Sequence, residues 1–356
     1  MRSRMRAAKV YVRRGGEGRP GFRVWEAMVK FFARHCAKFV LLMIAVSVVS
    51  FVLVAVSPID PVQANAGQAA LVSMSPEKKA QLAAYWGTDI PLWQRYGEWV
   101  VSAVQGDLGQ SLRFNAPVVD VIAWRAGNSF LLMGCAWLCS GVLGFALGVV
   151  AGMNRGGMVD RIVRAYCYVL ASTPTFWLAL LALIVFGVTL GWFPIGFSVP
   201  IGMAAEDVGL ADILYHMALP ALVLSFMGVA NIALHTREKT IDVMGGEYMR
   251  FATAQGQGGW KAFRRHGLRN VMLPAITLQF ASISEIFGGS VLVEQVFSYP
   301  GLGQAAVTAG LGGDAPLLVG IALASAAIVF GGNLIANILY GIIDPRIRKG
   351  ELYGVR

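Results

Sequence analysis

The most constraining feature of this sequence is the grouping of its apolar residues into long blocks that contain no charge. Five such blocks lack Asp, Glu, Lys and Arg: Phe39–Ile59, Ala126–Asn154, Ala165–Ala205, Ile213–Thr236 and Ala315–Ile343. A helix needs about 20 apolar residues to cross roughly 30 Å of hydrocarbon. Only 14% of the 356 residues are charged, compared with about 25% in soluble domains. The pattern predicts an all-α polytopic membrane protein.

Six transmembrane helices are predicted from these blocks and one further segment. Four blocks are long enough for one span each. The block 165–205 contains three prolines, so we expect one span from Ala165 to about Gly191 and then an extracytoplasmic loop. The remaining span, about Asn270–Leu292, contains a single charged residue, Glu285.

Lysine and arginine residues are distributed unevenly between the two sides of these spans. With a cytoplasmic N-terminus, 25 of the 30 lysines and arginines lie on the cytoplasmic side. The five others are Lys78, Lys79, Arg95, Arg113 and Arg125. Because cytoplasmic loops carry the basic excess, both termini are predicted to be cytoplasmic. Membrane orientation then explains the net charge of +10, and no nucleic-acid partner is expected.

The predicted spans divide the chain into five parts. Residues 1–38 are a basic cytoplasmic N-terminal tail, 39–57 the first span, and 58–127 an extracytoplasmic segment with amphipathic helices. Residues 128–343 are the core with the second to sixth spans, and 344–356 a cytoplasmic C-terminus. The tail and the first apolar stretch are both too long for a cleaved signal peptide, which favours a retained anchor.

Amphipathic stretches flank the first span on both sides. Residues 24–32 have the spacing of a helix that lies on the anionic inner leaflet, so membrane lipid is an expected partner. In the outer segment one helix is predicted over 75–86, and a second carries Trp93, Tyr96 and Trp99. Its aromatic residues fit a helix at the outer membrane surface and equally a docking or gating surface.

Small residues in the second span predict a close helix contact. Gly144, Gly148 and Gly152 recur every four residues. Glycines at this spacing let two helix backbones approach closely in lipid, although the sequence does not identify the second helix.

Neither a metal site nor a catalytic site is predicted. The cysteines are Cys36, Cys135, Cys139 and Cys167. They form no Cys-x-x-Cys pair, so neither a disulfide framework nor a zinc site is indicated. His216 and His235 lie at opposite ends of the fourth span and are interpreted as interfacial residues. The His-Glu-x-x-His pattern of a membrane-embedded enzyme is absent, and no cofactor is expected.

The most informative stretch, residues 245–257, lies between the fourth and fifth spans. Residues 247–255 predict a short helix that Gly256 closes. One face of this helix carries Tyr248, Phe251 and Ala252. A basic segment, 261–269, then leads into the next span. We expect such a helix, held parallel to the membrane, to transmit force from a cytoplasmic partner.

This stretch resembles the coupling-helix loop of permeases from binding-protein-dependent ABC importers, in the dipeptide, oligopeptide and nickel branch. The similarity lies in the run Tyr-x-x-x-Ala-x-Ala-x-Gly, followed by Arg-His-x-Leu-Arg-Asn-x-x-Leu-Pro. The positions to which the resemblance gives a coupling role are Glu247, Tyr248, Ala252, Ala254, Gln255, Gly256, Arg269, Leu273 and Pro274. At Gln255 the branch often has a basic residue instead.

Three further motifs fit the same branch and occur in the same order along the chain. They precede the second span, follow the fifth span and follow the sixth span. The matching positions are Gly106, Asp107, Gly109, Pro300, Gly301, Gly303, Asp344, Pro345 and Arg346. The resemblance covers roughly residues 39–350.

The resemblance implies an importer permease of the type I ABC fold in a bacterial inner membrane. Such a subunit lines half of a translocation pathway for dipeptides, oligopeptides, nickel or similar small solutes. Its implied partners are a second homologous permease, cytoplasmic ABC ATPase subunits and an extracytoplasmic solute-binding protein. The chain contains no Gly-Lys dipeptide and so no phosphate-binding Gly-x-x-x-x-Gly-Lys-[Ser/Thr] loop. ATP hydrolysis is therefore expected on a separate subunit.

Two questions stay open at the level of sequence. A carboxylate inside a span costs about 2.5–3.5 kcal/mol on insertion scales, so Glu285 is a candidate pathway residue. Alternatively, Ser282, Ser284 or a neighbouring helix bonds it. The rival function is an autonomous, ion-gradient-driven secondary transporter. Such transporters usually contain inverted repeats, and this chain shows no convincing internal repeat.

Overall fold

The computed structural model describes residues 20–56, 75–77, 90–200, 202 and 207–343. These parts are mainly helical, with one short hairpin of β1 (Gln110–Ser111) and β2 (Ala116–Pro117). Most of the helix predicted over 75–86 lies outside the described residues. The same holds for Asp344, Pro345 and Arg346 of the last motif.

Four helices are long and apolar enough to cross a membrane. They are α2 (Pro20–Val56), α7 (Val118–Met153), α10 (Leu210–Met244) and α16 (Ala315–Ile343). Two more helix pairs pass the same test only as bent pairs, so the described part of the chain has four spans, or six if each pair counts as one. The predicted all-helical, polytopic fold class is confirmed.

The third predicted span, 165–191, is wrong as a single straight helix. The chain forms α8 (Met158–Ser172) and then α9 (Thr175–Ala182), which continues as a π-helical segment, η1 (Leu183–Thr189). The two parts meet at an angle of 107°. Pro174 lacks a backbone N–H and disfavours helical geometry in the residue before it, and Thr173 is extended at φ −96° and ψ 126°.

The fifth predicted span begins earlier than expected and is also bent. After α12 (Gly259–Ala262) and η3 (Phe263–Gly267), α13 (Leu268–Ala281) and α14 (Ile283–Val296) meet at 49° around Ser282. The break frees the Gln279 carbonyl, which accepts hydrogen bonds from Trp137 Nε1 and Ser282 Oγ, each at 2.8 Å. A side chain of α7 therefore stabilises the bend.

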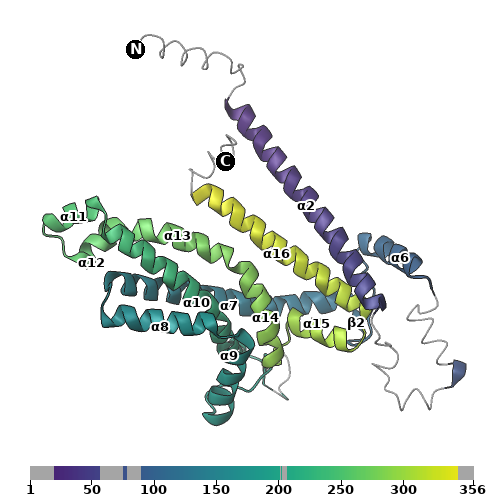
Figure 1. The fold of residues 1–356 in the computed structure, drawn as a ribbon. Helices are drawn as coiled ribbons and strands as arrows, with labels where there is room; N and C mark the ends of the chain where they lie inside the picture. Colours follow the sequence, from purple (N-terminus) through teal and green to yellow (C-terminus); the bar gives the residue numbers. More distant parts are fainter. Residues whose placement is uncertain (1–19, 57–74, 78–89, 201, 203–206, 344–356) are drawn as a thin grey trace, which may run out of the picture.

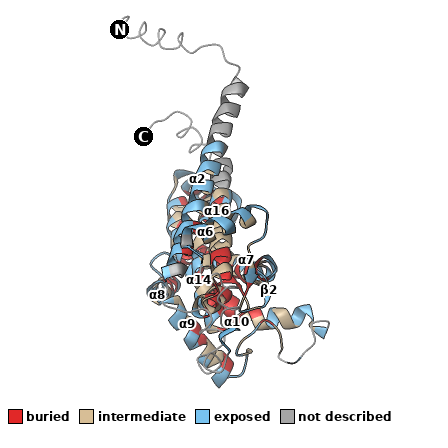
Figure 2. Ribbon diagram, turned by 90° about the vertical axis from the view of Figure 1, so that its right-hand side faces the viewer, coloured by how far each residue is buried: buried red, intermediate tan, exposed pale blue. Residues whose placement is uncertain are grey.

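Helix α10 lies at the centre of the fold and shares its largest interface with α7. A Cβ atom at Gly148 would lie 2.6 Å from the Ala233 carbonyl oxygen, and one at Gly152 would lie 2.6 Å from Thr240 Cβ. The glycines of the second span therefore allow the backbone of α10 to pack closely against α7. In the spanning window of α10, 67% of the residues are buried, compared with 11% in that of α2 (Figure 2), which lies at the edge of the fold (Figure 1).

Helices α6 (Leu92–Val104) and α15 (Leu302–Leu311) also lie outside the spans. The predicted aromatic helix is α6, which packs on the C-terminal end of α2, where Tyr96 Oη lies 2.8 Å from Ser47 Oγ. Helix α15 packs against α14, α16 and α7. Two boundaries differ from prediction: α7 begins at Val118 rather than near 128, and residues 24–32 continue α2 instead of forming a separate helix.

Candidate functional site

The short helix predicted over 247–255 is present as α11 (Glu247–Ala254). Gly256 has φ +79°, a conformation that glycine adopts without strain. Its N–H donates to the Thr253 carbonyl at 2.9 Å, and the N–H of Gln257 donates to the Ala252 carbonyl at 3.2 Å. This pair of bonds is the Schellman arrangement that ends many helices.

One face of α11 is buried against the ends of three longer helices. Met249 and Ala252 are 1% and 4% exposed. They belong to a cluster that contains Val149 of α7, Val243 of α10 and Val271 of α13. Ala252 therefore lies in the buried face with Met249, which corrects the expectation that it shares a face with Tyr248 and Phe251.

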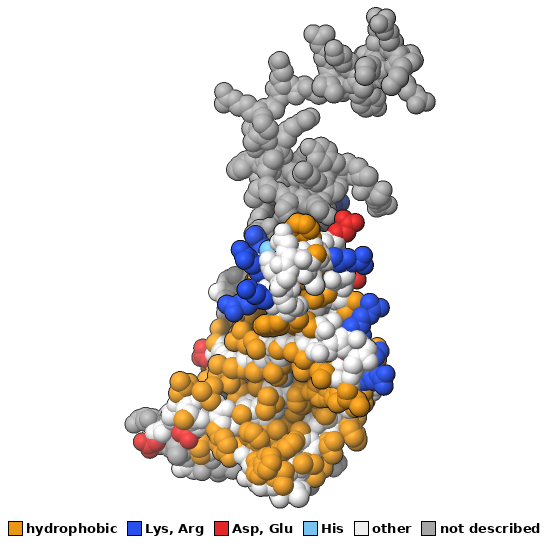
Figure 3. All heavy atoms as spheres, turned by 90° about the vertical axis from the view of Figure 1, so that its left-hand side faces the viewer, with side chains coloured by type: hydrophobic (Ala, Val, Ile, Leu, Met, Phe, Trp, Pro, Cys, Tyr) orange, Lys and Arg blue, Asp and Glu red, His pale blue; other side chains and the backbone are white. Residues whose placement is uncertain are grey.

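The opposite face of α11 exposes aromatic side chains. Tyr248 is 45% exposed and Phe251 is 65% exposed, and Trp260 of α12 is 59% exposed nearby in the chain. Exposed apolar patches of this kind mark interaction sites when polar residues surround them. Lysine and arginine side chains flank this part of the molecule above a broad apolar surface (Figure 3).

The other residues predicted for this site are only partly brought together. Glu247, Ala254, Gln255 and Arg269 are exposed, as are the basic residues of α12 and η3. Leu273 and Pro274 are half-buried within α13 and do not belong to the exposed face of α11. The contact that joins α13 to this face is a hydrogen bond of 3.2 Å from Asn270 Nδ2 to Tyr248 Oη.

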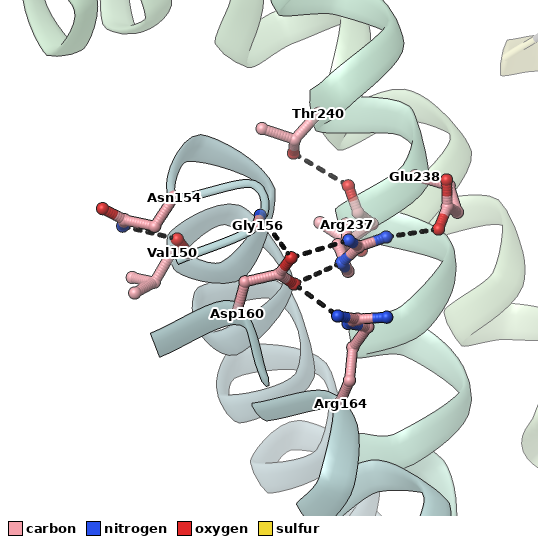
Figure 4. A network of polar contacts seen from close by, with 9 residues as sticks. Val150, Asn154, Gly156, Asp160, Arg164, Arg237, Glu238 and Thr240 are labelled. Atoms are coloured by element: carbon pink, nitrogen blue, oxygen red, sulfur yellow. Dashed lines mark hydrogen bonds and ion pairs between the residues drawn. The ribbon is translucent and has the colours of Figure 1, made fainter. Parts of the chain in front are cut away.

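A buried ion pair, which the sequence did not reveal, lies beside this end of the fold (Figure 4). Asp160 of α8 accepts hydrogen bonds from Arg237 Nε at 2.5 Å and from Arg237 Nη2 at 2.8 Å. The Gly156 N–H donates to the same carboxylate at 2.8 Å, and Arg164 Nε lies 3.4 Å away. We call the region of α11, α12 and this ion pair the α11 end.

A second buried carboxylate, Glu294, caps the N-terminus of α15. It accepts hydrogen bonds from Ser129 Oγ and from the Gly303 N–H, both at 2.7 Å, and from the Gln304 N–H at 3.3 Å. Ser129 Oγ accepts in turn from the Leu302 N–H at 2.8 Å. The first three N–H groups of α15, which no helical carbonyl can satisfy, are thus all bonded by side chains.

The motif Pro300, Gly301 and Gly303 is explained by this cap. A Cβ atom at Gly301 would lie 2.3 Å from Glu294 Cδ, and one at Gly303 would lie 2.5 Å from Val291 Cα. The Pro300 carbonyl accepts a hydrogen bond from Asn128 Nδ2 at 2.9 Å. The glycines are therefore needed because there is no space for a side chain beside the carboxylate.

The earlier motif lies in the same region, which we call the α15 end. Gly106 and Gly109 have φ +91° and +92°, and Asp107 Oδ1 accepts from the Gly109 N–H at 2.8 Å. Close by in the chain, Ser111 Oγ donates to buried Asp314 at 2.7 Å. Tyr299 is also fully buried here, and burial together with the charge of Glu294 raises the pKa of Tyr299 to about 12.

Glu285 is exposed in α14 and makes no hydrogen bond or ion pair with the described residues of this chain. The two serines expected to bond it donate elsewhere, Ser282 to the Gln279 carbonyl and Ser284 to Asn333 Oδ1. His216 Nδ1 lies 3.1 Å from the Gly196 carbonyl. Among the described residues, no three His, Cys, Asp or Glu side chains are grouped as metal ligands would be.

Comparison with known proteins decides the identity of this scaffold. Residues 144–349 match the family described as the inner-membrane component of binding-protein-dependent transport systems. Residues 28–127 match the N-terminal region described for the membrane components of such systems. The chain belongs to this family. As a permease of the family it is a multi-pass inner-membrane protein and a transport subunit rather than an enzyme.

Two relatives place the permease more closely. It is 32% identical over 321 residues to the oligopeptide transport system permease protein AppB of Bacillus subtilis, covering 90% of this chain and 99% of the relative. It is 31% identical over 339 residues to the dipeptide transport system permease protein DppB of Escherichia coli, with the same coverage of both chains. The resemblance seen in the motifs therefore extends along nearly the whole permease.

Proposed function

We propose that this permease forms half of the translocation pathway of an ATP-driven importer for dipeptides or oligopeptides. The observation that carries the proposal is the two-sided packing of α11. Its buried face joins three long helices, and its exposed face presents Tyr248 and Phe251. The substrate class is supported by relatives that are named for oligopeptide and dipeptide transport.

The packing of α11 explains how force would reach the pathway. Met249 and Ala252 are enclosed by side chains of α7, α10, η3 and α13. Protein interiors are close-packed, so a helix that fills such a cluster cannot move without displacing its neighbours. An ATPase that binds the aromatic face of α11 would therefore move the ends of three long helices together.

The same placement supports a cytoplasmic position for the α11 end. The α11 end carries exposed basic residues, among them Arg250, Lys261, Arg264 and Arg265. The positive-inside rule assigns such an end to the cytoplasm, and with it the N-terminus. The α15 end then faces the opposite side, where an extracytoplasmic solute-binding protein delivers the substrate.

A second homologous permease and membrane lipid would cover the remaining apolar surface. Only 11% of the spanning window of α2 and 22% of that of α16 are buried, compared with 67% for α10. Exposed Glu285 lies on α14, and a charge facing lipid is costly. We assign Glu285 to the aqueous pathway between the two permeases.

The coupling role of α11 is tested with Gly256→Asp and with deletion of residues 248–256. Gly256 has open space around it, so the aspartate is expected to leave the permease inserted while it places a charge at the ATPase contact. The matched control is Gly191→Asp, because Gly191 is also exposed, has φ +63° and has no neighbour within 4 Å. The assay is ATP-dependent peptide uptake by the complete complex in proteoliposomes.

Loss of uptake in both α11 variants, with normal uptake in the control, supports the proposal. Normal substrate-stimulated ATP hydrolysis and uptake in Gly256→Asp contradict it. The purified permease alone is also tested in liposomes with an ion gradient, since uptake there would instead indicate a secondary transporter. The substrate class is read from the ligand that co-purifies with the solute-binding protein, where a nickel chelate in place of a peptide would correct our assignment.

A further inference from the structure

The ion pair of Asp160 and Arg237 joins α8 to α10 in an unusually well-defined way (Figure 4). Asp160 is fully buried and Arg237 is 8% exposed. Two guanidinium nitrogens, Nε and Nη2, bond the two carboxylate oxygens at 2.5 and 2.8 Å. The remaining guanidinium nitrogen, Nη1, donates to Glu238 at 2.5 Å. The arginine is therefore fixed on all sides of its planar group.

Stability alone is a weak explanation for this pair. Two buried charges lose hydration, and apolar side chains of similar volume often stabilise a fold as well or better. The remaining α8–α10 contact is of that apolar kind, with Val163 and Cys167 packed on Ala230 and Ala233. Among the residues that the structure describes, the pair provides the sole side-chain hydrogen bonds between α8 and α10. The ion pair therefore fixes the relative position of α8 and α10, which their apolar contact alone would allow to slide along each other.

The position of Arg237 connects the pair to α11. Arg237 lies about two turns before the end of α10 at Met244, and α11 begins at Glu247. Val243 of α10 and Met249 of α11 are packed in one buried cluster. A displacement of α11 thus reaches Arg237 through less than three turns of helix.

Asp160 lies at the other side of the pair, in the first turn of α8. Helix α8 runs from there to the sharp bend at Pro174 and on into α9. The two parallel hydrogen bonds fix both the distance and the relative orientation of the Arg237 guanidinium and the Asp160 carboxylate. A shift of Arg237 therefore moves Asp160 with it. Slippage between apolar surfaces meets no such directional constraint.

We propose that the Asp160–Arg237 pair is a positioning contact that makes α8 follow α10 when α11 is displaced by the ATPase. The inference rests on the proposed coupling role of α11. It adds α8 and the bend at Pro174 to the moving part of the permease, beyond the helices that contact α11 directly.

The first test is Arg237→Lys, which keeps the positive charge and removes the two-point fork. The matched control is Arg155→Lys, in the exposed loop before α8. Both variants are assembled with the ATPase, the second permease and the binding protein in proteoliposomes. The measurement is the number of peptides transported per ATP hydrolysed. We expect this ratio to fall at least about fivefold in Arg237→Lys, as for a lost charge-assisted hydrogen bond, and to stay unchanged in the control.

A purely structural role would lower the amount of assembled complex without changing this ratio, and that result overturns the proposal. Should Arg237→Lys fail to assemble, spin labels at Met158 of α8 and Asp242 of α10 test the unmutated pair. Both positions are exposed, and the four native cysteines are replaced by alanine. A constant label distance between nucleotide-free and ATP-bound complexes supports the proposal, and a changing distance overturns it. If Gly256→Asp uncouples transport while Arg237→Lys does not, this inference fails and the proposed function stands.

Discussion

The α15 end and the α11 end of this permease are completed in different ways. At the α15 end, a short helix starts on Glu294 and Ser129, and each of its first three N–H groups is bonded within the chain. At the α11 end, a short helix starts without any side-chain cap and is held on one face only. The hydrogen bonds at the start of α15 are completed within the chain, whereas the α11 end leaves aromatic side chains exposed for a partner.

Glycines show the same contrast. Gly301 is required because a side chain there would collide with Glu294. Gly256 is required because of its backbone angle, φ +79°, and the space around it is open. Substitutions at the two positions should therefore differ in how much they lower the free energy of unfolding and in the physical cause of the loss. We order the predictions from the largest expected effect on the free energy of unfolding to the smallest.

The largest effect is expected for Gly301→Ala. The added Cβ would lie 2.3 Å from Glu294 Cδ, so the carboxylate must move away from the N–H groups of Gly303 and Gln304. Overpacking and the lost cap together should lower the free energy of unfolding by about 3 kcal/mol or more. The measurement is denaturant titration of the purified permease in detergent.

Gly310→Ala is the control for this prediction, because Gly310 lies in α15, the helix that Gly301 caps, and has nothing within 4 Å. Replacement of a glycine by alanine in an open helical position should leave the free energy of unfolding unchanged or raise it slightly. Equal stability of the two variants would show that the α15 end is less tightly packed than we describe.

A smaller loss is expected for Glu294→Ala. Removal of the carboxylate leaves the Gly303 and Gln304 N–H groups and the Ser129 hydroxyl without their acceptor. Unsatisfied buried donors should cost about 1–3 kcal/mol in total stability, with Glu294→Gln losing less because one acceptor oxygen remains. Thermal unfolding in detergent distinguishes these variants.

Glu285→Ala provides the comparison, since Glu285 is exposed on the same helix and has no described partner. Its unfolding free energy should change by less than about 0.5 kcal/mol. A destabilisation as large as that of Glu294→Ala would mean that Glu285 is bonded within the fold rather than placed in the pathway.

The sequence predicts the parts of this permease that depend on local pattern. Charge-free blocks indicate the membrane helices, and Gly256 marks the end of α11, because both signals lie within a few consecutive residues. The bend at Pro174 was missed as a break between two helices because the charge-free block 165–205 continues across it. The prolines of this block were used only to end the span near Gly191, although Pro174 was the available signal for the bend.

The roles of the buried carboxylates of Asp160 and Glu294 were missed for a different reason. Glu294 bonds Ser129 across 165 positions of the chain, and Asp160 bonds Arg237 across 77. No spacing rule connects residues so far apart, and only the helix arrangement brings them together. Glu294 lies six positions before Pro300, at the end of an apolar segment, so an acid followed closely by Gly301 and Gly303 is the signal that could have suggested a cap.

At the α11 end, Gly256→Ala should cost about 1 kcal/mol of the free energy of unfolding. The reason is backbone strain alone, since alanine is disfavoured at φ +79° but meets no neighbour. Gly258→Ala is the matched control, because Gly258 has open space and lacks a positive φ. A loss above about 3 kcal/mol for Gly256→Ala would place this glycine in a packed joint like that of Gly301.

The smallest effect on stability is expected for Phe251→Ala. Phe251 is 65% exposed, so the isolated permease should lose less than about 0.5 kcal/mol of its unfolding free energy. An aromatic side chain at the centre of an interface nevertheless often contributes more than 1 kcal/mol to binding. We therefore expect affinity for the ATPase, measured by titration in detergent or nanodiscs, to fall about tenfold or more.

Leu311→Ala controls for the loss of exposed apolar area as such. Leu311 is 73% exposed but lies at the C-terminal end of α15, so it should leave both stability and ATPase affinity unchanged. A fall in ATPase affinity with both variants would mean that apolar area anywhere on the chain determines assembly. A fall with Phe251→Ala alone, without loss of stability, would show that the exposed face of α11 is preserved for its partner and contributes little to the fold.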